Sequence, residues 1–324
     1  MVSRKDVAEL AEVSPTSVSY YINDTGYVGA KARQRIQEAI DTLGYNPNQI
    51  ARSLKIKDSR QFVFFCNEIR NPFYSQLVHQ ATKAALKEDY VTLFSPVVDD
   101  DKYIRKVCGY QISGVFASNN RIGVDAINTM AKQNIPVVIL RDVKWPDLSP
   151  KVTQIKVDYS YIMDEIVVHL REQGCNEMHY ISSSSSPKIL DEKTKAFFKA
   201  YNKEDVQVSF GIADTSEAFE KIVSSYSSDN CPDAFVCTND AVAFGVLKAI
   251  TTIGLRVPED VMVVGFDNAY IAKYSVPSIT SVDIESEKMG KIAIDLLIRK
   301  LHGEEVDDYV VTPHLIVRQS SIRE

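Results

Sequence analysis

Polar and aromatic side chains follow several short apolar runs in the second part of the sequence, at positions where parallel strands would end. They are Phe73, Tyr74, Asn119, Arg141, Asp142, Asn239, Asp240 and Asp267. The carboxyl ends of parallel strands meet at one edge of a sheet, so these side chains can converge on a ligand. Carboxylate and amide groups above an aromatic floor suit a polyhydroxylated molecule, because one Asp accepts hydrogen bonds from two neighbouring hydroxyls. The alternative, above all for Asn119 and Arg141, is that they cap loops after strands.

A second set of polar residues lies near the start of the chain, in the segment DVAELAEVSPTSVSYYIN at 6–23. Ser14 followed by Pro15 indicates a helix start, since the serine oxygen can accept a backbone N–H and proline at the first position sacrifices no hydrogen bond. A helix over 15–23 then places Val18 and Ile22 inward. We expect three residues of the preceding helix and turn to pack against them: Ala8, Leu10 and Val13.

The outer face of this second helix then carries short polar groups and one ring: Pro15, Thr16, Ser19, Tyr20 and Asn23. Such a face can hydrogen-bond to phosphates and base edges at close range. The arrangement predicts a helix-turn-helix that presents its second helix to the major groove of DNA. The alternative is a three-helix cap with a solvated polar face.

The sequence contains no motif that indicates catalysis, a metal or a cofactor. It has no GxSxG or HExxH, and its histidines are scattered, with His169 inside the apolar run IVVHL. Five cysteines, an odd number without a CxxC pair, suit neither a disulfide framework nor a zinc site. The serine run at 182–186 lacks the glycine spacing of a phosphate-binding loop, and we expect it to form a flexible edge of the ligand site. We therefore predict a protein that is not an enzyme and needs no cofactor.

Composition and charge indicate a globular chain with an unequal charge distribution. The 324 residues are enough for two or three ordinary domains. Residues 1–58 carry eight Lys/Arg and seven Asp/Glu, a net of +1, within a chain of net charge −6. This balance argues against indiscriminate coating of nucleic acid and is compatible with sequence-specific binding. No apolar run reaches the length of a membrane span, and the start lacks a secretory pattern, so we predict a cytoplasmic protein.

Two kinds of hydrophobic pattern divide the chain. Helical patterns at roughly 4–11, 15–23 and 31–43, the last ending at Gly44, predict a compact three-helix unit, and NQIARSLKIK offers one more short helix. After position 60, short apolar runs alternate with stretches of helical length. The runs cover 62–68, 90–96, 114–119, 136–140, 153–157, 177–183, 234–239 and 261–267. Strands that alternate with helices predict parallel sheets, and this length favours two α/β lobes.

The motifs together resemble the LacI family of bacterial transcription regulators. DVAELAEVSPTSVSYYIN follows the DVAxxAxVSxxTVSxxxN pattern of that family, and GYNPNQIARSLK follows its hinge pattern GYxPNxxARxL. NPFYSQL, IPVV, PDAFVCTNDAVAFGVLKAI, GLRVPEDVMVVGFDN and PHLIVRQS follow in the family's order and extend the resemblance over essentially the whole chain. It implies a helix-turn-helix domain at 1–46, a hinge at 47–59 and a periplasmic-binding-protein-like effector domain at 60–324. The lobes of that domain would cover about 60–157 with 285–310, and about 158–282 with 311–324.

The resemblance also implies roles for single residues in DNA binding. Base contacts fall on Pro15, Thr16 and Tyr20, and phosphate contacts on Ser14, Ser17, Ser19 and Asn23. Tyr20 stands where relatives frequently carry arginine or histidine, so the DNA site can differ from the commonest one of the family. In the hinge, with Asn48 and Arg52, Leu54 matches a leucine that the family inserts into the minor groove.

For the ligand, the resemblance points to the FDN context of Asp267 first and to Asn239 next, with Phe73, Tyr74, Asn119 and Arg141 also lining the site. Lys193 falls where relatives usually carry an arginine that contacts the ligand. Lysine offers a point charge rather than a planar fork, so the ligand geometry can differ.

We therefore predict a homodimeric, ligand-responsive repressor that binds a near-palindromic double-stranded operator and no membrane. A sugar or sugar phosphate is the favoured effector, and a purine or nucleoside is the alternative within the family. From other classes, the alternatives are a solute-binding protein and a sugar-metabolising enzyme on the same lobes. The missing export signal and the helix-turn-helix argue against the former.

Overall fold

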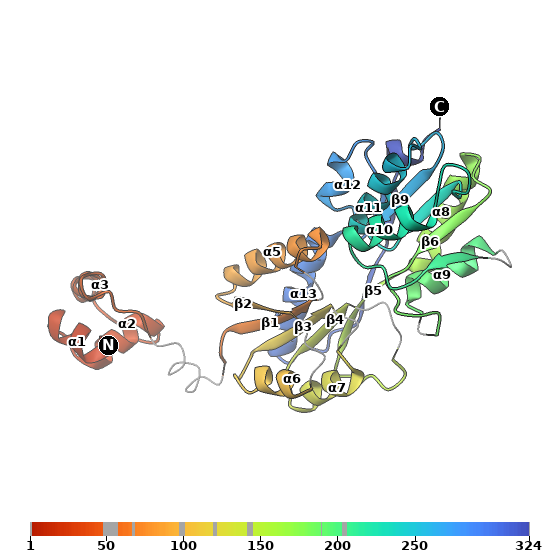
Figure 1. Ribbon diagram of the computed structural model, residues 1–324. Helices are drawn as coiled ribbons and strands as arrows, with labels where there is room; N and C mark the ends of the chain where they lie inside the picture. Colours follow the sequence, from red (N-terminus) through yellow and green to blue (C-terminus); the bar gives the residue numbers. More distant parts are fainter. Residues whose placement is uncertain are drawn as a thin grey trace. The chain divides into compact units, whose positions relative to one another are not determined.

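The computed structural model describes residues 2–47, 58–66, 69–96, 101–118, 122–140, 145–188, 190–202 and 206–323. The chain divides into two compact units, Met1–Ser59 and Arg60–Glu324. In Figure 1 the first unit carries the red helices and the second carries all labelled strands.

The first unit is a three-helix domain with a small apolar core. Its helices are α1 (Arg4–Leu10), α2 (Pro15–Asn23) and α3 (Ala30–Leu43), and the last ends before Gly44 as predicted. Side chains from all three helices form one buried cluster, with Val28 from the loop between α2 and α3; its members are Val7, Ala8, Ala11, Val18, Val28, Ile36 and Ala39. The helices therefore stabilise one another through packing, which short helices need because they are marginal alone.

One predicted partner of α2 in this core is wrong. Leu10 is 51% exposed, whereas Val7 is fully buried. Val7, Ala8 and Ala11 define the inward face of α1, and at about 100° per residue Leu10 lies roughly 110° from the centre of that face. Ala8 is buried and Val13 packs partly buried against the core, as expected.

Within its described residues, the second unit contains two six-stranded sheets. The first sheet has the order β11-β5-β4-β3-β1-β2, and all of its neighbouring strands are parallel. Its elements are β1 (Gln61–Cys66), α5 (Pro72–Lys87), β2 (Val91–Pro96), α6 (Asp101–Cys108), β3 (Gly114–Ser118), α7 (Val124–Lys132), β4 (Val137–Leu140), β5 (Thr153–Val157), α13 (Ser286–Leu301) and β11 (Tyr309–Val311).

The second sheet has the order β12-β10-β9-β8-β6-β7, and only its β10–β12 pair is antiparallel among the described strands. Its elements are α8 (Tyr159–Glu172), β6 (Met178–Ile181), α9 (Glu192–Tyr201), β7 (Gln207–Ser209), α10 (Thr215–Ser225), β8 (Ala234–Cys237), α11 (Asp240–Thr252), β9 (Met262–Phe266), α12 (Tyr270–Tyr274), β10 (Thr280–Asp283), β12 (His314–Ile316) and the 3₁₀ turn η1 (Gln319–Ser321). The predicted α/β class with two mainly parallel sheets is confirmed.

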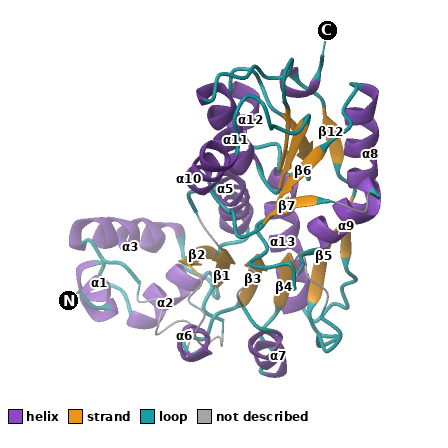
Figure 2. Cartoon of the chain, turned by 45° about the vertical axis from the view of Figure 1, so that its right-hand side comes forward, coloured by secondary structure: helices purple, strands orange, loops and turns teal. Residues whose placement is uncertain are grey.

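Helices cover both faces of each sheet. In Figures 1 and 2, α5 and α13 lie on one side of the first sheet and α6 and α7 on the other. Successive residues of β1 accordingly alternate between cores: Phe62 and Phe64 join the cluster under α5 and α13, whereas Val63 and Phe65 join the one under α6 and α7. The second sheet is covered by α8 and α9 on one face and by α10 and α11 on the other. Burial on both faces explains why the strands read as continuous apolar runs.

The cysteines pack in or against the apolar clusters of the second unit. No disulfide joins any two of the five, and burial raises the pKa of the Cys66 thiol to about 12. A thiol that stays protonated at neutral pH is unreactive. Within the described ranges, no group of three or more His, Cys, Asp or Glu side chains is arranged to hold a metal ion. The same residues include no helix with the length and apolar content required to cross a membrane.

His179 is a buried histidine on β6 with hydrogen-bond partners on both ring nitrogens. Nδ1 lies 2.8 Å from the Tyr226 hydroxyl and 3.2 Å from Gln207 Oε1, and Nε2 lies 3.0 Å from the Ser209 hydroxyl. Burial lowers the pKa of this imidazole below its usual value, which favours the neutral form of the ring. The unfolded chain therefore binds a proton more readily than the folded chain does, and stability falls as pH drops below about 6.5.

We expect His179→Gln to reduce the loss of stability between pH 7 and pH 5, because the buried ring that must accept a proton is gone. The urea midpoint of unfolding measures this at both pH values. The variant itself costs about 1–3 kcal/mol at pH 7, since it disturbs a buried hydrogen-bond network. His302→Gln, at an exposed position, is the matched control for the loss of one histidine side chain. If the stability of His179→Gln falls between pH 7 and pH 5 as much as that of the wild type, His179 is not a source of the pH dependence.

Candidate functional site

The outer face of α2 is polar and accessible, as the sequence predicts. Four of its candidate DNA-contacting residues are exposed, namely Ser14, Pro15, Thr16 and Tyr20, and three are partly exposed, namely Ser17, Ser19 and Asn23. Val18 is fully buried on the opposite face. The helix thus offers one surface of hydroxyls, an amide and an aromatic ring to a partner.

Hydrogen bonds within the first unit fix the two ends of α2. The Ser14 hydroxyl accepts the backbone N–H of Ser17 at 3.1 Å, which caps the helix as expected. At the other end, Asn23 Nδ2 donates to the Ser19 carbonyl at 2.8 Å. Arg4 Nη1 donates to the Ser19 hydroxyl at 3.3 Å, so a cation from α1 lies beside the polar face. These contacts hold the helix in place and also put a positive charge where a phosphate could bind.

Tyr21 points away from this face and has a packing role. Its hydroxyl donates to Gln37 Oε1 at 2.6 Å, and the Arg33 guanidinium lies 5.7 Å from its ring centre. The hinge residues Asn48, Arg52 and Leu54 lie outside the described residues.

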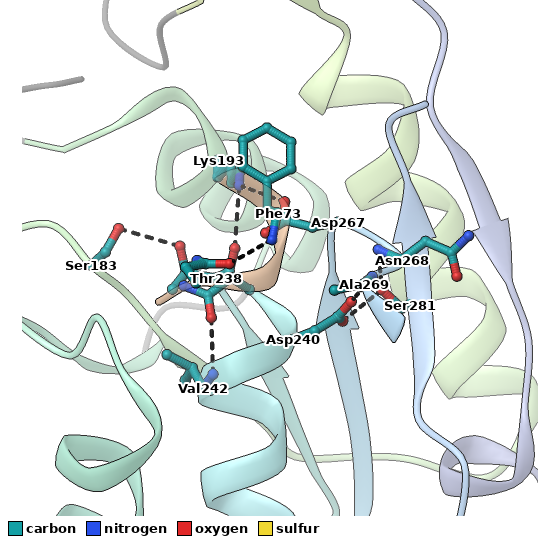
Figure 3. A network of polar contacts seen from close by, with 12 residues as sticks. Phe73, Ser183, Lys193, Thr238, Asp240, Val242, Asp267, Asn268, Ala269 and Ser281 are labelled. Carbon is teal, nitrogen blue, oxygen red and sulfur yellow. Dashed lines mark hydrogen bonds and ion pairs between the residues drawn. The ribbon is translucent and has the colours of Figure 1, made fainter. Parts of the chain in front are cut away.

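In the second unit, Lys193 and Asp267 form a buried ion pair beyond the carboxyl ends of two strands of the second sheet (Figure 3). Lys193 Nζ lies 3.9 Å from Asp267 Oδ1 and donates to the Thr238 carbonyl at 3.2 Å. The two residues are only 7% and 5% exposed. Desolvating two charges is costly, and their mutual attraction and further hydrogen bonds offset that cost only partly. A polar ligand that adds hydrogen bonds to this pair would therefore bind favourably.

Aromatic rings surround the lysine. Its Nζ lies 4.3 Å from the ring centre of Phe266 and 5.6 Å from that of Tyr159, distances that allow cation–π attraction. Phe73 is buried in the same continuous hydrophobic cluster as these two rings and appears with the ion pair in Figure 3. Tyr74 stacks edge-to-face on Phe73, with the ring centres 5.0 Å apart. A buried ion pair and several aromatic rings therefore lie together at this point of the fold.

Asp240 holds the backbone that presents Asp267. Its carboxylate accepts the Ala269 N–H and the Ser281 hydroxyl, both at 2.6 Å, and is 1% exposed (Figure 3). Burial, followed by the nearby charge of Asp267, raises the pKa of Asp240 well above its usual value. Asp267 itself has φ 98°, a conformation that L-residues rarely adopt without support. The hydrogen bonds of Asp240 give that support, since they fix the turn immediately after Asp267.

Gly265 on β9 makes room for this carboxylate. A Cβ atom at position 265 would lie 2.2 Å from Asp240 Oδ1, far inside van der Waals contact. The glycine in the run VMVVGFD is thus required by the close approach of Asp240, a relation that the sequence alone does not reveal.

Asn239 is a helix cap in this structure. Its side-chain oxygen accepts the Val242 N–H at 2.9 Å at the start of α11, and its amide donates to the Ala213 carbonyl at 3.4 Å. The side chain is partly exposed, so a ligand contact stays a prediction. Asn119 and Arg141 lie outside the described residues.

The serine run after β6 is hydrogen-bonded rather than loose, contrary to our expectation. Ser182 is buried, and its hydroxyl lies 2.8 Å from that of Thr194 on α9. Ser184 donates to Asp191 Oδ2 at 2.8 Å, just before the same helix. These contacts secure the start of the helix that carries Lys193. The sequence also gave no sign of Tyr159 or of the Thr238 carbonyl as neighbours of the lysine, because their proximity arises only in the folded sheet.

Family comparisons agree with both halves of this description. Residues 4–48 match the family model "Bacterial regulatory proteins, lacI family", and residues 167–321 match the "Periplasmic binding protein-like domain". Among curated proteins, the chain is 28% identical to the HTH-type transcriptional repressor PurR of Aliivibrio fischeri, over 99% of this chain and 98% of that repressor. It is 26% identical to the repressor of the same name from Photobacterium profundum, with the same coverage.

Solved structures share the fold over the full length. The Lac repressor dimer bound to operator and the anti-inducer ONPF superposes with a TM-score of 0.83 at 23% identity, covering 99% of each chain. The transcriptional regulator CelR in complex with cellobiose gives a TM-score of 0.68 at 22% identity, covering 99% of this chain and 100% of that one. The matched curated relatives are repressors rather than enzymes, in line with the lack of a catalytic motif. The chain therefore combines a helix-turn-helix domain of the lacI family with a periplasmic-binding-protein-like domain, and its curated relatives over the full length are HTH-type transcriptional repressors.

Proposed function

We propose that this protein is a transcription repressor that binds a near-palindromic DNA operator as a homodimer and responds to a small polar effector. The observation that carries the proposal is the presence, in one chain, of an exposed polar recognition helix and a buried Lys193–Asp267 pair at strand ends. Because the proposed target is DNA, we also propose that the protein acts in the cytoplasm.

In the proposed DNA complex, α2 lies in the major groove. Pro15, Thr16 and Tyr20 face base edges, and the hydroxyls of Ser14, Ser17 and Ser19, with the Asn23 amide, face phosphates. Two heads related by a two-fold axis then contact two half-sites, which explains why the operator should be near-palindromic. The hinge at 47–59, with Leu54 inserted in the minor groove, joins this contact to the effector domain.

In the proposed effector complex, Asp267 and Lys193 contact the ligand, with Phe73 and Tyr74 beneath it. Asp267 accepts hydrogen bonds from hydroxyls, and Lys193 donates to an oxygen of the ligand. A sugar or sugar phosphate is favoured, and chains of the same fold are described with bound cellobiose, ribose and sucrose. A purine base or nucleoside is the second candidate. The remaining residues proposed for this site are Asn119, Arg141 and Asn239.

The effector changes DNA affinity by binding more tightly to one arrangement of the two lobes than to the other. The second unit crosses between its two sheets after β5, before α13 and after β11. A movement of one lobe relative to the other therefore involves all of these connections. The spacing of the two hinges in the dimer then changes with it.

Selection of bound sequences from randomised duplex DNA tests DNA recognition. We expect the full-length chain to enrich a two-fold symmetric sequence with a flexible central step, and the affinity for it to fall steeply with salt. Enrichment only after addition of a candidate effector identifies a corepressor. No enrichment at low or high salt, with or without sugars and purines, would contradict the proposed repressor.

Thermal unfolding with a panel of sugars, sugar phosphates, purine bases and nucleosides tests the ligand site. A ligand at about 100 times its Kd stabilises the folded state by about 2.7 kcal/mol, which raises the unfolding midpoint. We expect Lys193→Met to weaken binding of the active compound at least about tenfold, since it removes a buried charge-assisted hydrogen bond. Lys199→Met, on the exposed side of the same helix, should bind normally. Equal binding by both variants would exclude Lys193 from the site.

A further inference from the structure

Gly26 lies directly against the ring of Tyr20. A Cβ atom built at position 26 would lie 2.7 Å from Tyr20 Cγ and 2.7 Å from Cδ2, with Cδ1 at 3.0 Å. Three atoms of one ring at such distances mean that the ring rests on the Cα of the glycine. No side chain larger than hydrogen fits between them while the ring keeps its position.

The backbone gives no other reason for glycine at this position. Gly26 is not among the glycines with positive φ, so its conformation is open to any L-residue. No atom other than those of the Tyr20 ring is among the three nearest to the added Cβ. The contact with Tyr20 is therefore the constraint that the structure places on this residue.

The contact leaves part of the Tyr20 ring free to meet a partner. Tyr20 is 42% exposed, so part of its side chain remains accessible while the base of its ring lies against Gly26 in the loop after α2. A tyrosine carries its single hydrogen-bonding group at the end of a rigid ring. Fixing the ring therefore fixes the place at which the hydroxyl can meet a base edge.

We propose that Gly26 is a positioning residue for DNA recognition, which acts through Tyr20 and sets which base pair the tyrosine accepts. The inference rests on the proposed function, in which α2 enters the major groove. An alanine at position 26 pushes the ring off the loop. Because the ring is partly exposed, it can swing into solvent, so the fold stays intact while the recognition contact is lost.

The test is a double-mutant cycle with the full-length chain and the duplex enriched by the wild-type protein. Wild type, Gly26→Ala, Tyr20→Ala and the double variant are titrated by fluorescence anisotropy against this duplex. The same titrations are repeated with duplexes in which each half-site base pair is changed in turn. Thermal unfolding of each variant reports on the fold. Gly29→Ala is the control from the same loop, since a Cβ there meets only the Tyr27 hydroxyl, at 3.9 Å.

We expect Gly26→Ala to weaken binding about threefold to tenfold, the range for an aromatic side chain that loses its preorganisation. It should lose discrimination at the same base pair as Tyr20→Ala, with the unfolding midpoint unchanged. In the Tyr20→Ala background the Gly26 substitution should have no further effect, and Gly29→Ala should bind as wild type.

Either of two results would overturn this inference without affecting the proposed function. One is that Gly26→Ala discriminates between base pairs as the wild type does. The other is that this substitution lowers the affinity for DNA equally in the presence and absence of the Tyr20 ring. The second result would indicate a merely structural role for the glycine. If the wild-type chain enriches no sequence at all, the proposed function fails and this inference fails with it, so the two failures are distinguishable.

Discussion

The buried carboxylate of Asp240 is the constraint on which the effector side of this molecule depends. It links three segments that are distant in sequence: the start of α11, the turn after β9 and strand β10. Without its two short hydrogen bonds, the turn would lose support for the positive φ of Asp267. A hydrogen bond contributes about 0.5–1.5 kcal/mol net, so two of them offset much of the cost of about 1–3 kcal/mol for one strained residue. Gly265 belongs to the same arrangement, since it leaves the space that Asp240 fills.

The two chemical surfaces of the chain are built on different physical principles. The recognition face of α2 is a helix surface whose ends are capped and whose polar groups stay in water until a partner displaces it. The Lys193–Asp267 pair is already desolvated, and aromatic rings cover the lysine. A buried pair gains little from its own attraction alone, so additional hydrogen bonds from a ligand have a large effect there. In the function we propose, the first surface meets DNA and the second meets a small molecule.

Much of the architecture could be predicted from the sequence because local signals were strong. Ser14-Pro15 marked the start of α2, and the long apolar runs marked strands that are buried on both faces. Four strands escaped prediction, namely β7, β10, β11 and β12, which have three or four residues each. A segment of this length carries too little periodicity, and its pairing partners lie far away in sequence. Leu10 was predicted to face inward, which is wrong, because Val7 and Ala11 set the inward face of the last turn of α1 and Leu10 lies away from it.

For the candidate site, the types of residue could be predicted, but the separate structural role of each residue could not. Asn239 and Asp240 both follow β8 and look equivalent in the sequence, yet one caps a helix at the surface while the other supports a turn in the interior. The serine run looked loose, but its hydroxyls secure the start of α9. The relation between Gly26 and Tyr20 was invisible for the same reason, since it depends on how the loop folds back over the helix. Contacts of this kind arise from tertiary structure and leave no local pattern.

The most direct test of the account is the reciprocal coupling between operator DNA and effector in the full-length protein. The affinity for the enriched duplex is measured with and without saturating effector, and the affinity for the effector is measured with and without duplex. We predict that each partner changes the affinity for the other by the same factor, about 5-fold to 150-fold, as thermodynamic linkage requires. We also predict that this coupling disappears in Asp267→Asn at the same effector concentration. An unchanged affinity for the duplex at saturating effector would contradict the claim that this protein is a ligand-controlled repressor.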